Sequence, residues 1–176
     1  MADAMHPPVD EYLEAILELE EEGARIIQAR LADRLGVSAP SVSEMVRRLR
    51  AEGYLEVNGD RTLTLTHKGR DWATTIVRRH RLAERLLTDL LGLPWHRAHI
   101  EACRWEHVIS AEVEELIRAK LDNPLTCPHG NPIPGVEGRV ATVAPDQTRL
   151  VTIGRDTTIA VGSAIANSLY VSLQPA

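Results

Sequence analysis

IIQARLADRLGVSAPSVSEMVRRLR, residues 26–50, is the stretch that decides the fold of the N-terminal part of the chain. Gly36, Val37 and Ser38 predict a tight turn between two helices, because glycine favours a helix end and Ser38 can cap the next helix. Pro40 fits the first turn of that second helix. One face of the second helix is apolar, formed by Val42, Met45, Val46 and Leu49. The stretch therefore predicts a helix-turn-helix.

The flanking sequence extends this motif on both sides. An amphipathic helix is expected from Val9 to about Gly23, with Pro7 and Pro8 just ahead of it. After Gly53, alternating apolar residues on both sides of the turn sequence 58–61, Asn-Gly-Asp-Arg, predict a hairpin. Helix, helix, turn, helix and hairpin make a winged helix-turn-helix, which we assign to residues 1–73.

Beyond the hairpin the chain reads as helical and then as β-rich. Three helices are expected, at about His67–Leu91, Trp95–Ile109 and Ser110–Leu121, and the proline-rich stretch that follows is a loop. Residues 74–137 form a helical domain in this interpretation. Residues 138–176 form a short β-rich segment with strands expected around Val140, Val151, Ile159 and Val171. The predicted fold class is mainly α with small β.

The net charge of -5 is unevenly distributed along the chain. Counting Lys and Arg against Asp and Glu gives -8 for residues 1–22, +6 for residues 23–88 and -3 for residues 89–176, which sum to -5. A basic middle segment in an acidic chain is typical of a DNA-contacting module. The first ten residues lack the pattern of a secretory signal and no apolar run is long enough for a membrane span, so we expect a cytoplasmic protein without a membrane partner.

The segments after the hairpin are rich in side chains that bind metals. His99, Cys103, Glu106 and His107 are spaced so that all four fall within an arc of about 100° on one helix. His80 and Glu84 share a face of the preceding helix, and Glu11 and Glu14 share a flank of the first helix. Imidazole and carboxylate suit Fe, Mn, Zn, Co or Ni. One such pair alone is usually an ordinary surface feature, but six ligand types in two helical stripes favour one or two metal sites.

At these positions the sequence resembles the family of the diphtheria toxin repressor and the iron-dependent regulators, with their manganese-responsive relatives. The resemblance covers about residues 8–136. It is carried by three strings, ACRWEHV at 102–108, RHRLAERLL at 79–87 and GNPIP at 130–134. It implies a helical domain for metal binding and dimerisation, and a C-terminal segment like a truncated SH3-like domain.

The resemblance also implies two ligand sets. One consists of His80, Glu84 and His99, and the other of Cys103, Glu106 and His107 with a residue of the first helix. Glu11 stands where iron-type members have methionine, and together with Glu14 it resembles manganese-type members, whereas Cys103 is iron-type. Fe²⁺ and Mn²⁺ therefore both stay open, and Zn²⁺, Co²⁺ or Ni²⁺ are expected to bind in vitro. Cys127 and His129 in the proline-rich loop are expected to be ordinary loop residues.

For DNA, the resemblance implies that the family approaches bases from the start of the second helix of the motif. The corresponding residues here are Ser38, Ala39, Pro40, Ser41 and Glu44. Further candidates for phosphate or groove-edge contacts are Gln28, Arg48, Arg50 and Arg61. Glu44 stands where iron-type members have glutamine, so we expect an altered operator.

We therefore predict a metal-dependent repressor controlling metal homeostasis genes, with Fe²⁺ or Mn²⁺ as corepressor, acting as a homodimer on a palindromic operator. An enzyme is disfavoured, because the sequence has no H-E-x-x-H motif, no Gly-rich phosphate loop and no nucleophile elbow. The alternative is a winged-helix regulator that responds to another signal and uses the metal only for structure.

Overall fold

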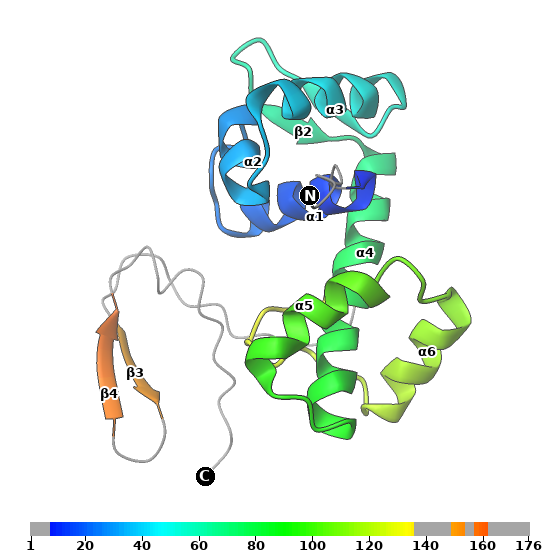
Figure 1. Cartoon of the computed structure of the whole chain (residues 1–176), viewed down its shortest axis with the longest axis vertical. Coiled ribbons are helices and arrows are strands. Elements are labelled where there is room, and N and C mark those ends of the chain that lie inside the picture. Colours follow the sequence, from blue (N-terminus) through cyan, green and yellow to red (C-terminus); the bar gives the residue numbers. More distant parts are fainter. Residues whose placement is uncertain (1–7, 136–148, 154–156, 162–176) are drawn as a thin grey trace, which may run out of the picture. The chain divides into compact units, whose positions relative to one another are not determined.

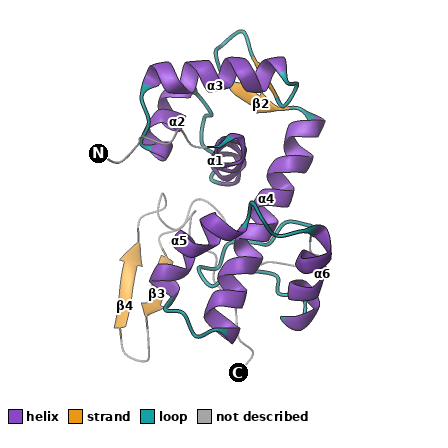
Figure 2. Ribbon diagram, turned by 45° about the vertical axis from the view of Figure 1, so that its right-hand side comes forward, coloured by secondary structure: helices purple, strands orange, loops and turns teal. Residues whose placement is uncertain are grey.

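The computed structural model describes residues 8–135, 149–153 and 157–161, which divide into two compact units, Met1–Val77 and Arg78–Ala176. Helices make up most of the described chain, and the strands are confined to two short hairpins (Figures 1 and 2). The predicted fold class, mainly α with small β, is confirmed. No helix among the described residues combines the length and the hydrophobicity that a membrane span requires.

The first unit begins with three helices, α1 (Val9–Glu21), α2 (Gln28–Leu35) and α3 (Ala39–Ala51). Gly36 ends α2 in the left-handed conformation, with φ of 64°, where a side chain would be strained. Ser38 starts α3, because its Oγ accepts a hydrogen bond from the backbone N–H of Ser41 at 3.3 Å. The helix-turn-helix that the sequence predicts is therefore present.

The wing follows as an antiparallel hairpin of β1 (Leu55–Val57) and β2 (Leu63–Leu65), paired with Leu55 opposite Leu65. The leucines of both strands face inward, whereas Glu56 and Thr64 are exposed, as alternation along a half-buried strand requires. In the connecting turn Arg61 adopts a left-handed conformation with φ of 65°. The predicted hairpin is confirmed.

One hydrophobic core holds the first unit together. It is built mainly from Tyr12, Leu13, Ile16, Leu31, Val42, Val46, Leu49, Leu55, Leu63 and Leu65. Each fully buried leucine or isoleucine of this kind contributes about 1.5–3 kcal/mol relative to an exposed one. The core therefore uses the apolar faces of all three helices and the inner face of the wing.

Helix α4 (His67–Arg85) begins directly after the wing and packs on it at Gly69. A Cβ placed on Gly69 would lie 1.9 Å from the carbonyl oxygen of Tyr54, which also accepts from the backbone N–H of Thr66 at 3.0 Å. Only a residue without a side chain allows this approach of helix and wing.

The second unit contains the end of α4, a π-helical turn (Leu86–Leu90), α5 (Trp95–Trp105) and α6 (Ala111–Lys120). Its core is formed by Leu82, Ala83, Leu87, Ala98, Ala102, Ile109, Ile117 and Ile133. We expected the middle helix to continue to Ile109, but it ends at Trp105, and residues 106–108 form a turn. The expectation was wrong because apolar periodicity continues through this turn, whose Ile109 is buried without being helical.

Near the C-terminus, β3 (Arg149–Ile153) and β4 (Thr157–Val161) pair antiparallel, with Val151 opposite Ile159. These are two of the four strands expected from the sequence. The other two, around Val140 and Val171, lie outside the described residues, and the likeness to an SH3-like domain stays a prediction.

Candidate metal centre and nucleic-acid interface

His80 of α4 is buried at the centre of a polar cluster in the second unit. The residue is 3% exposed, and its Nδ1 donates to Glu106 Oε2 at 2.5 Å. Its other nitrogen, Nε2, lies 3.0 Å from His99 Nδ1. A carboxylate on one ring nitrogen fixes the ring orientation and leaves the other nitrogen to face an ion, which is the usual arrangement of metal-binding histidines.

Glu84 lies one turn after His80 on the same face of α4. Its Oε1 lies 3.3 Å from His80 Nε2 and 3.4 Å from His99 Nδ1. Donor atoms bound to one small transition-metal ion at about 2.1 Å are about 3.0–3.4 Å apart, so these three atoms have suitable spacing. Burial raises the pKa of the Glu84 carboxyl, but hydrogen bonds from His80 and His99 outweigh burial and leave the pKa well below its usual value. The carboxylate is therefore ionised.

Cys103 follows His99 by one turn of α5, and its Sγ lies 3.9 Å from His99 Nε2. The thiol groups with His80 and His99, since the donor atoms of all three residues lie within 4.8 Å of one another. The hydrogen bond with Cys103, followed in size by that with Glu84, raises the pKa of His99 to about 10. Burial raises the pKa of Cys103, but the hydrogen bonds and charges of His80 and His99 together outweigh burial and lower the pKa to about 7. At neutral pH the Cys103 side chain is therefore a thiolate in about half of the molecules, and the thiolate is the form that binds metals.

Glu106 and His107 lie in the turn after α5 rather than on the helix. The Glu106 side chain is fully buried, and His107 Nε2 lies 3.4 Å from its Oε1. Among the described residues no hydrogen bond reaches this buried Oε1. A buried carboxylate oxygen without a donor is costly unless a cation compensates its charge. The two ligand sets implied by the resemblance are thus in contact through His80, which touches both His99 and Glu106.

A second group of donor atoms lies beside the first. Glu84 Oε1 is 3.2 Å from His129 Nδ1, and the donor atoms of Glu84, Cys127 and His129 lie within 4.8 Å of one another. Glu84 comes from α4, whereas a tight loop presents Cys127 and His129 and is closed by a hydrogen bond from Cys127 N to Asn131 O at 2.8 Å. Burial and the charge of Glu84 raise the pKa of Cys127 to about 11. We expected ordinary loop residues here; the two-residue spacing of Cys and His was the signal available in the sequence.

The donors in this region fit a divalent transition metal. Imidazole, carboxylate and thiol groups are its usual ligands, they are gathered at ligand-to-ligand distances, and one buried carboxylate oxygen has no donor. Glu11 and Glu14 lie on α1, in the first unit. Their part in metal binding stays a prediction, as do the roles of the other residues.

Helix α3 presents most of the predicted DNA-binding residues. Ala39, Pro40 and Glu44 are exposed on its first turns, and the Ser38 and Ser41 hydroxyls lie 2.8 Å apart. Helix N-terminal residues of this kind contact base edges when a recognition helix enters the major groove. This face is therefore suited to a DNA groove.

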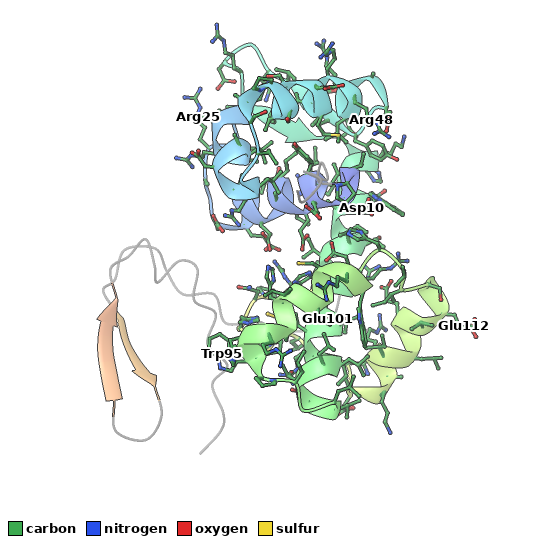
Figure 3. The ribbon with its side chains drawn as sticks, viewed as in Figure 1. Asp10, Arg25, Arg48, Trp95, Glu101 and Glu112 are labelled. Atoms are coloured by element: carbon green, nitrogen blue, oxygen red, sulfur yellow. The ribbon has the colours of Figure 1, made fainter. Side chains whose placement is uncertain are left out.

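The remaining candidates surround this face. Gln28 begins α2, and its Oε1 accepts from Ser43 at 2.8 Å. Arg48, labelled in Figure 3, points outward from α3, and its Nε donates to Glu52 at 2.7 Å. Arg50 is exposed near the end of α3, and Arg61 is exposed in the wing turn. All of them belong to the first unit, and their contacts with DNA stay predictions.

Comparison with known families gives two adjacent matches. The N-terminal DNA binding domain of iron dependent repressors matches residues 5–63. The metal binding and dimerisation domain of iron dependent repressors matches residues 66–135. The two matches meet at the start of α4 and together include both clusters described above.

Curated relatives agree with these matches. The chain is 55% identical to the iron-dependent repressor IdeR of Mycobacterium tuberculosis over 125 residues, 71% of this chain and 54% of the relative. It is 51% identical to the diphtheria toxin repressor of Corynebacterium diphtheriae over 126 residues, 72% of this chain and 56% of the relative. The chain thus spans about half the length of the curated relatives it matches.

Solved structures are similar as well. The structure of the manganese regulator SloR matches with a TM-score of 0.79 and 27% identity, covering 97% of this chain and 100% of that one. A manganese-dependent transcriptional repressor in complex with manganese matches with a TM-score of 0.69 and 40% identity, covering 77% and 63%. ScaR with bound Zn²⁺ matches with a TM-score of 0.64 and 34% identity, covering 73% and 60%.

Proposed function

Because the chain belongs to the iron-dependent repressor family, we propose that it is a transcriptional repressor that binds operator DNA when a divalent transition metal occupies its second unit. The observation that carries this proposal is the contact of buried His80 and Glu84 with the exposed ring of His99, at 3.0–3.4 Å, in a chain that also folds a winged helix-turn-helix. Relatives are named as repressors, which supports a regulator rather than an enzyme.

Fe²⁺ and Mn²⁺ are the proposed physiological ions. The resemblance assigns His80, Glu84 and His99 to one ion and Cys103, Glu106 and His107, with Glu11 and Glu14, to another. The Cys103 thiol itself lies beside His80 and His99 of the first set. When bound, an ion supplies positive charge that holds these side chains in one arrangement. The names of the relatives include iron-dependent and manganese-dependent repressors, so both ions are supported.

The chain's own residues explain how metal would control DNA binding. Glu106 orients His80, and His80 in turn faces Glu84 and His99, so the helices α4 and α5 share one polar cluster. If metal and operator both favour the same conformation of the protein, each raises the affinity of the other by the same factor. Metal then acts as a corepressor.

DNA binding is assigned to α3 and the wing. The proposed base-facing residues are Ser38, Ala39, Pro40, Ser41 and Glu44. Gln28, Arg48, Arg50 and Arg61 would contact phosphates or the groove edge, where positive side chains set the register on the duplex. A palindromic operator follows from a homodimer, since two identical recognition helices are related by twofold symmetry.

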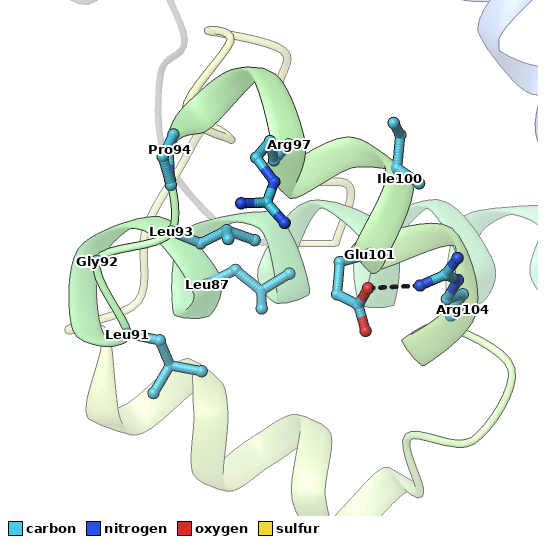
Figure 4. Close-up of a pocket in the computed structure, with 9 residues that line it drawn as sticks. All are labelled: Leu87, Leu91, Gly92, Leu93, Pro94, Arg97, Ile100, Glu101 and Arg104. Carbon is cyan, nitrogen blue, oxygen red and sulfur yellow. Dashed lines mark hydrogen bonds and ion pairs between the residues drawn. The ribbon is translucent and has the colours of Figure 1, made fainter.

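An apolar face of the second unit supports the homodimer. A hollow of about 530 Å³ lies between the turn after the π-helix and α5, with Leu91 and Ile100 exposed on its rim (Figure 4). Glu101 and Arg104 pair at 2.9 Å beside it. The matched domain is described as one for dimerisation, so a second copy of this chain is the proposed occupant.

The test is fluorescence anisotropy of a labelled palindromic operator of the family type, titrated with protein under anoxic conditions. Chelator, Fe²⁺, Mn²⁺ and Zn²⁺ are compared at buffered free concentrations. We expect binding only with metal, and the ion effective at the lowest free concentration identifies the corepressor. Full binding with chelator would instead support the alternative regulator, with a structural metal and another signal.

A matched pair of variants links this result to the cluster. Glu84→Gln should weaken metal-activated DNA binding at least tenfold, because it removes the charge that faces three imidazoles. Glu115→Gln makes the same substitution at an exposed position of α6 and should leave the metal response unchanged. Equal responses of the two variants would contradict the role given to Glu84.

A further inference from the structure

The polar side chains of α3 differ in whether they are already engaged within the protein. Ser38 and Ser41 pair with each other at 2.8 Å, and Ser43 donates to Gln28 at 2.8 Å. A group that must give up an internal partner gains less from a base than a group that is unengaged. The hydroxyls of Ser38, Ser41 and Ser43 therefore gain less free energy from a hydrogen bond to a base than an unengaged side chain would gain.

Glu44 is the unengaged acidic side chain on this face. It is exposed in the second turn of α3, and none of the described residues forms a hydrogen bond or ion pair with it. The usual helical partner would be Arg48, four residues later, since Glu before Arg at this spacing is the favoured order. Arg48 instead directs its Nε to Glu52 at 2.7 Å. The Glu44 carboxylate is left as a free acceptor.

The surface beside Glu44 is hollowed. A recess of about 280 Å³ is lined by Tyr12, Ser41, Glu44, Met45 and Arg48. Met45, which is half-buried, gives the recess an apolar wall beside the carboxylate. A recess with an apolar wall and one negative charge, that of the Glu44 carboxylate, suits a donor on a base edge at that place better than a phosphate, which the carboxylate repels.

Base chemistry then selects the partner. In the major groove only cytosine N4 and adenine N6 donate hydrogen bonds. Adenine presents the acceptor N7 next to its donor, which would repel a carboxylate, whereas cytosine presents no acceptor on that edge. A carboxylate at this place therefore favours cytosine and disfavours guanine, whose edge carries acceptors only.

We propose that Glu44 is a specificity-determining residue that accepts a hydrogen bond from the exocyclic amine of a cytosine in each operator half-site. This inference rests on the proposed function, because it assumes that α3 enters the major groove. The negative charge of Glu44 also lowers the affinity for DNA that lacks the cytosine. Discrimination between operators therefore arises from repulsion as well as from attraction.

The experiment is a selection from a randomised duplex DNA pool, using the metal-loaded chain of 176 residues and its Glu44→Gln variant. We expect the wild type to select a motif with one symmetry-related cytosine per half-site. The variant should select adenine at that position, because an amide can both donate to N7 and accept from N6, and should leave other positions unchanged. Anisotropy with duplexes that differ only at this base pair should show a preference of about five- to a hundredfold in opposite directions.

Glu115→Gln is the matched control, since Glu115 is an exposed glutamate of α6, outside α3 and the wing, and its substitution removes the same charge. It should select the wild-type motif. An unchanged motif in the Glu44→Gln variant would overturn the inference while leaving metal-dependent repression intact. DNA binding that is equally strong with and without metal would overturn the proposed function instead. If the position that changes in the Glu44→Gln variant is not a cytosine in the wild-type motif, this inference alone would be overturned.

Discussion

Replacement of Gly69 by alanine tests the packing of α4 on the wing. In an ordinary helix interior this substitution stabilises the protein by about 0.5–1 kcal/mol, because alanine is the better helix former. Here the new Cβ would lie 1.9 Å from the Tyr54 carbonyl oxygen and 2.8 Å from its carbon, although ordinary contact begins near 3.4 Å. Both neighbours are backbone atoms, so no side chain can rotate to relieve the overlap. The effect must therefore change sign.

The magnitude follows from the shift that the overlap requires. Helix or strand must move by more than 1 Å, and overpacking of this kind costs about 3 kcal/mol at its upper range. The hydrogen bond from Thr66 N to Tyr54 O, 3.0 Å long, is lost with the shift and adds about 1 kcal/mol. Subtracting the gain in helix propensity leaves about 3 kcal/mol of destabilisation. For a chain of 176 residues this lowers Tm by about 6–12 °C.

The assay is thermal unfolding of the full chain followed by circular dichroism at fixed metal and pH. Gly59→Ala is the control, since Gly59 lies in the wing turn with no atom within 4 Å of an added Cβ and without a left-handed φ. Its Tm should change by less than about 2 °C. An unchanged or raised Tm for Gly69→Ala would refute the argument that the Tyr54 carbonyl excludes a side chain.

Three further outcomes are expected. In metal-free protein Cys103 should react with iodoacetamide at about half its high-pH rate at pH 7 and at about a tenth of that high-pH rate at pH 6, because its pKa is lowered to about 7. Mass spectrometry should find Cys127, which is buried and has its pKa raised to about 11, unmodified at pH 7. Equal labelling of the two cysteines would contradict these pKa shifts. Glu114→Ala should destabilise the chain by about 3 kcal/mol in urea unfolding, since this buried carboxylate accepts from two arginines of α4, and a loss below 1 kcal/mol would show that the arginines find other partners. Ser38→Ala should cost about 1 kcal/mol through loss of the α3 cap, whereas Ser38→Gly should recover most of this loss; equal losses would argue against capping.

Local signals in the sequence were sufficient to predict the helices and hairpin of the first unit. The turn at Gly36 and the cap at Ser38 are determined by short-range chemistry, and the alternation around Gly59 needs only neighbouring residues. Helical spacing also placed His80 with Glu84 and His99 with Cys103. Each of these depends on contacts between residues close in sequence, which periodicity describes well.

Features that depend on tertiary contact were not predictable in the same way. The end of α5 at Trp105 is hidden, because Ile109 continues the apolar pattern through a turn. The approach of His129 to Glu84 joins residues 45 positions apart through a loop whose course the sequence does not reveal. The pairing of Arg48 with Glu52 rather than Glu44 is a choice between two equal spacings, and propensity alone does not decide it.

The position of Glu84 limits how many metal ions the protein can bind at the same time. One oxygen of this side chain faces His80, His99 and His129 at 3.2–3.4 Å, so two neighbouring donor groups share a single negative charge. An ion bound in one group neutralises the Glu84 charge, which would otherwise attract an ion to the other group. Binding at one group therefore weakens binding at the other. A count of ligand residues in the sequence therefore overstates capacity, and occupancy is a property of the whole cluster.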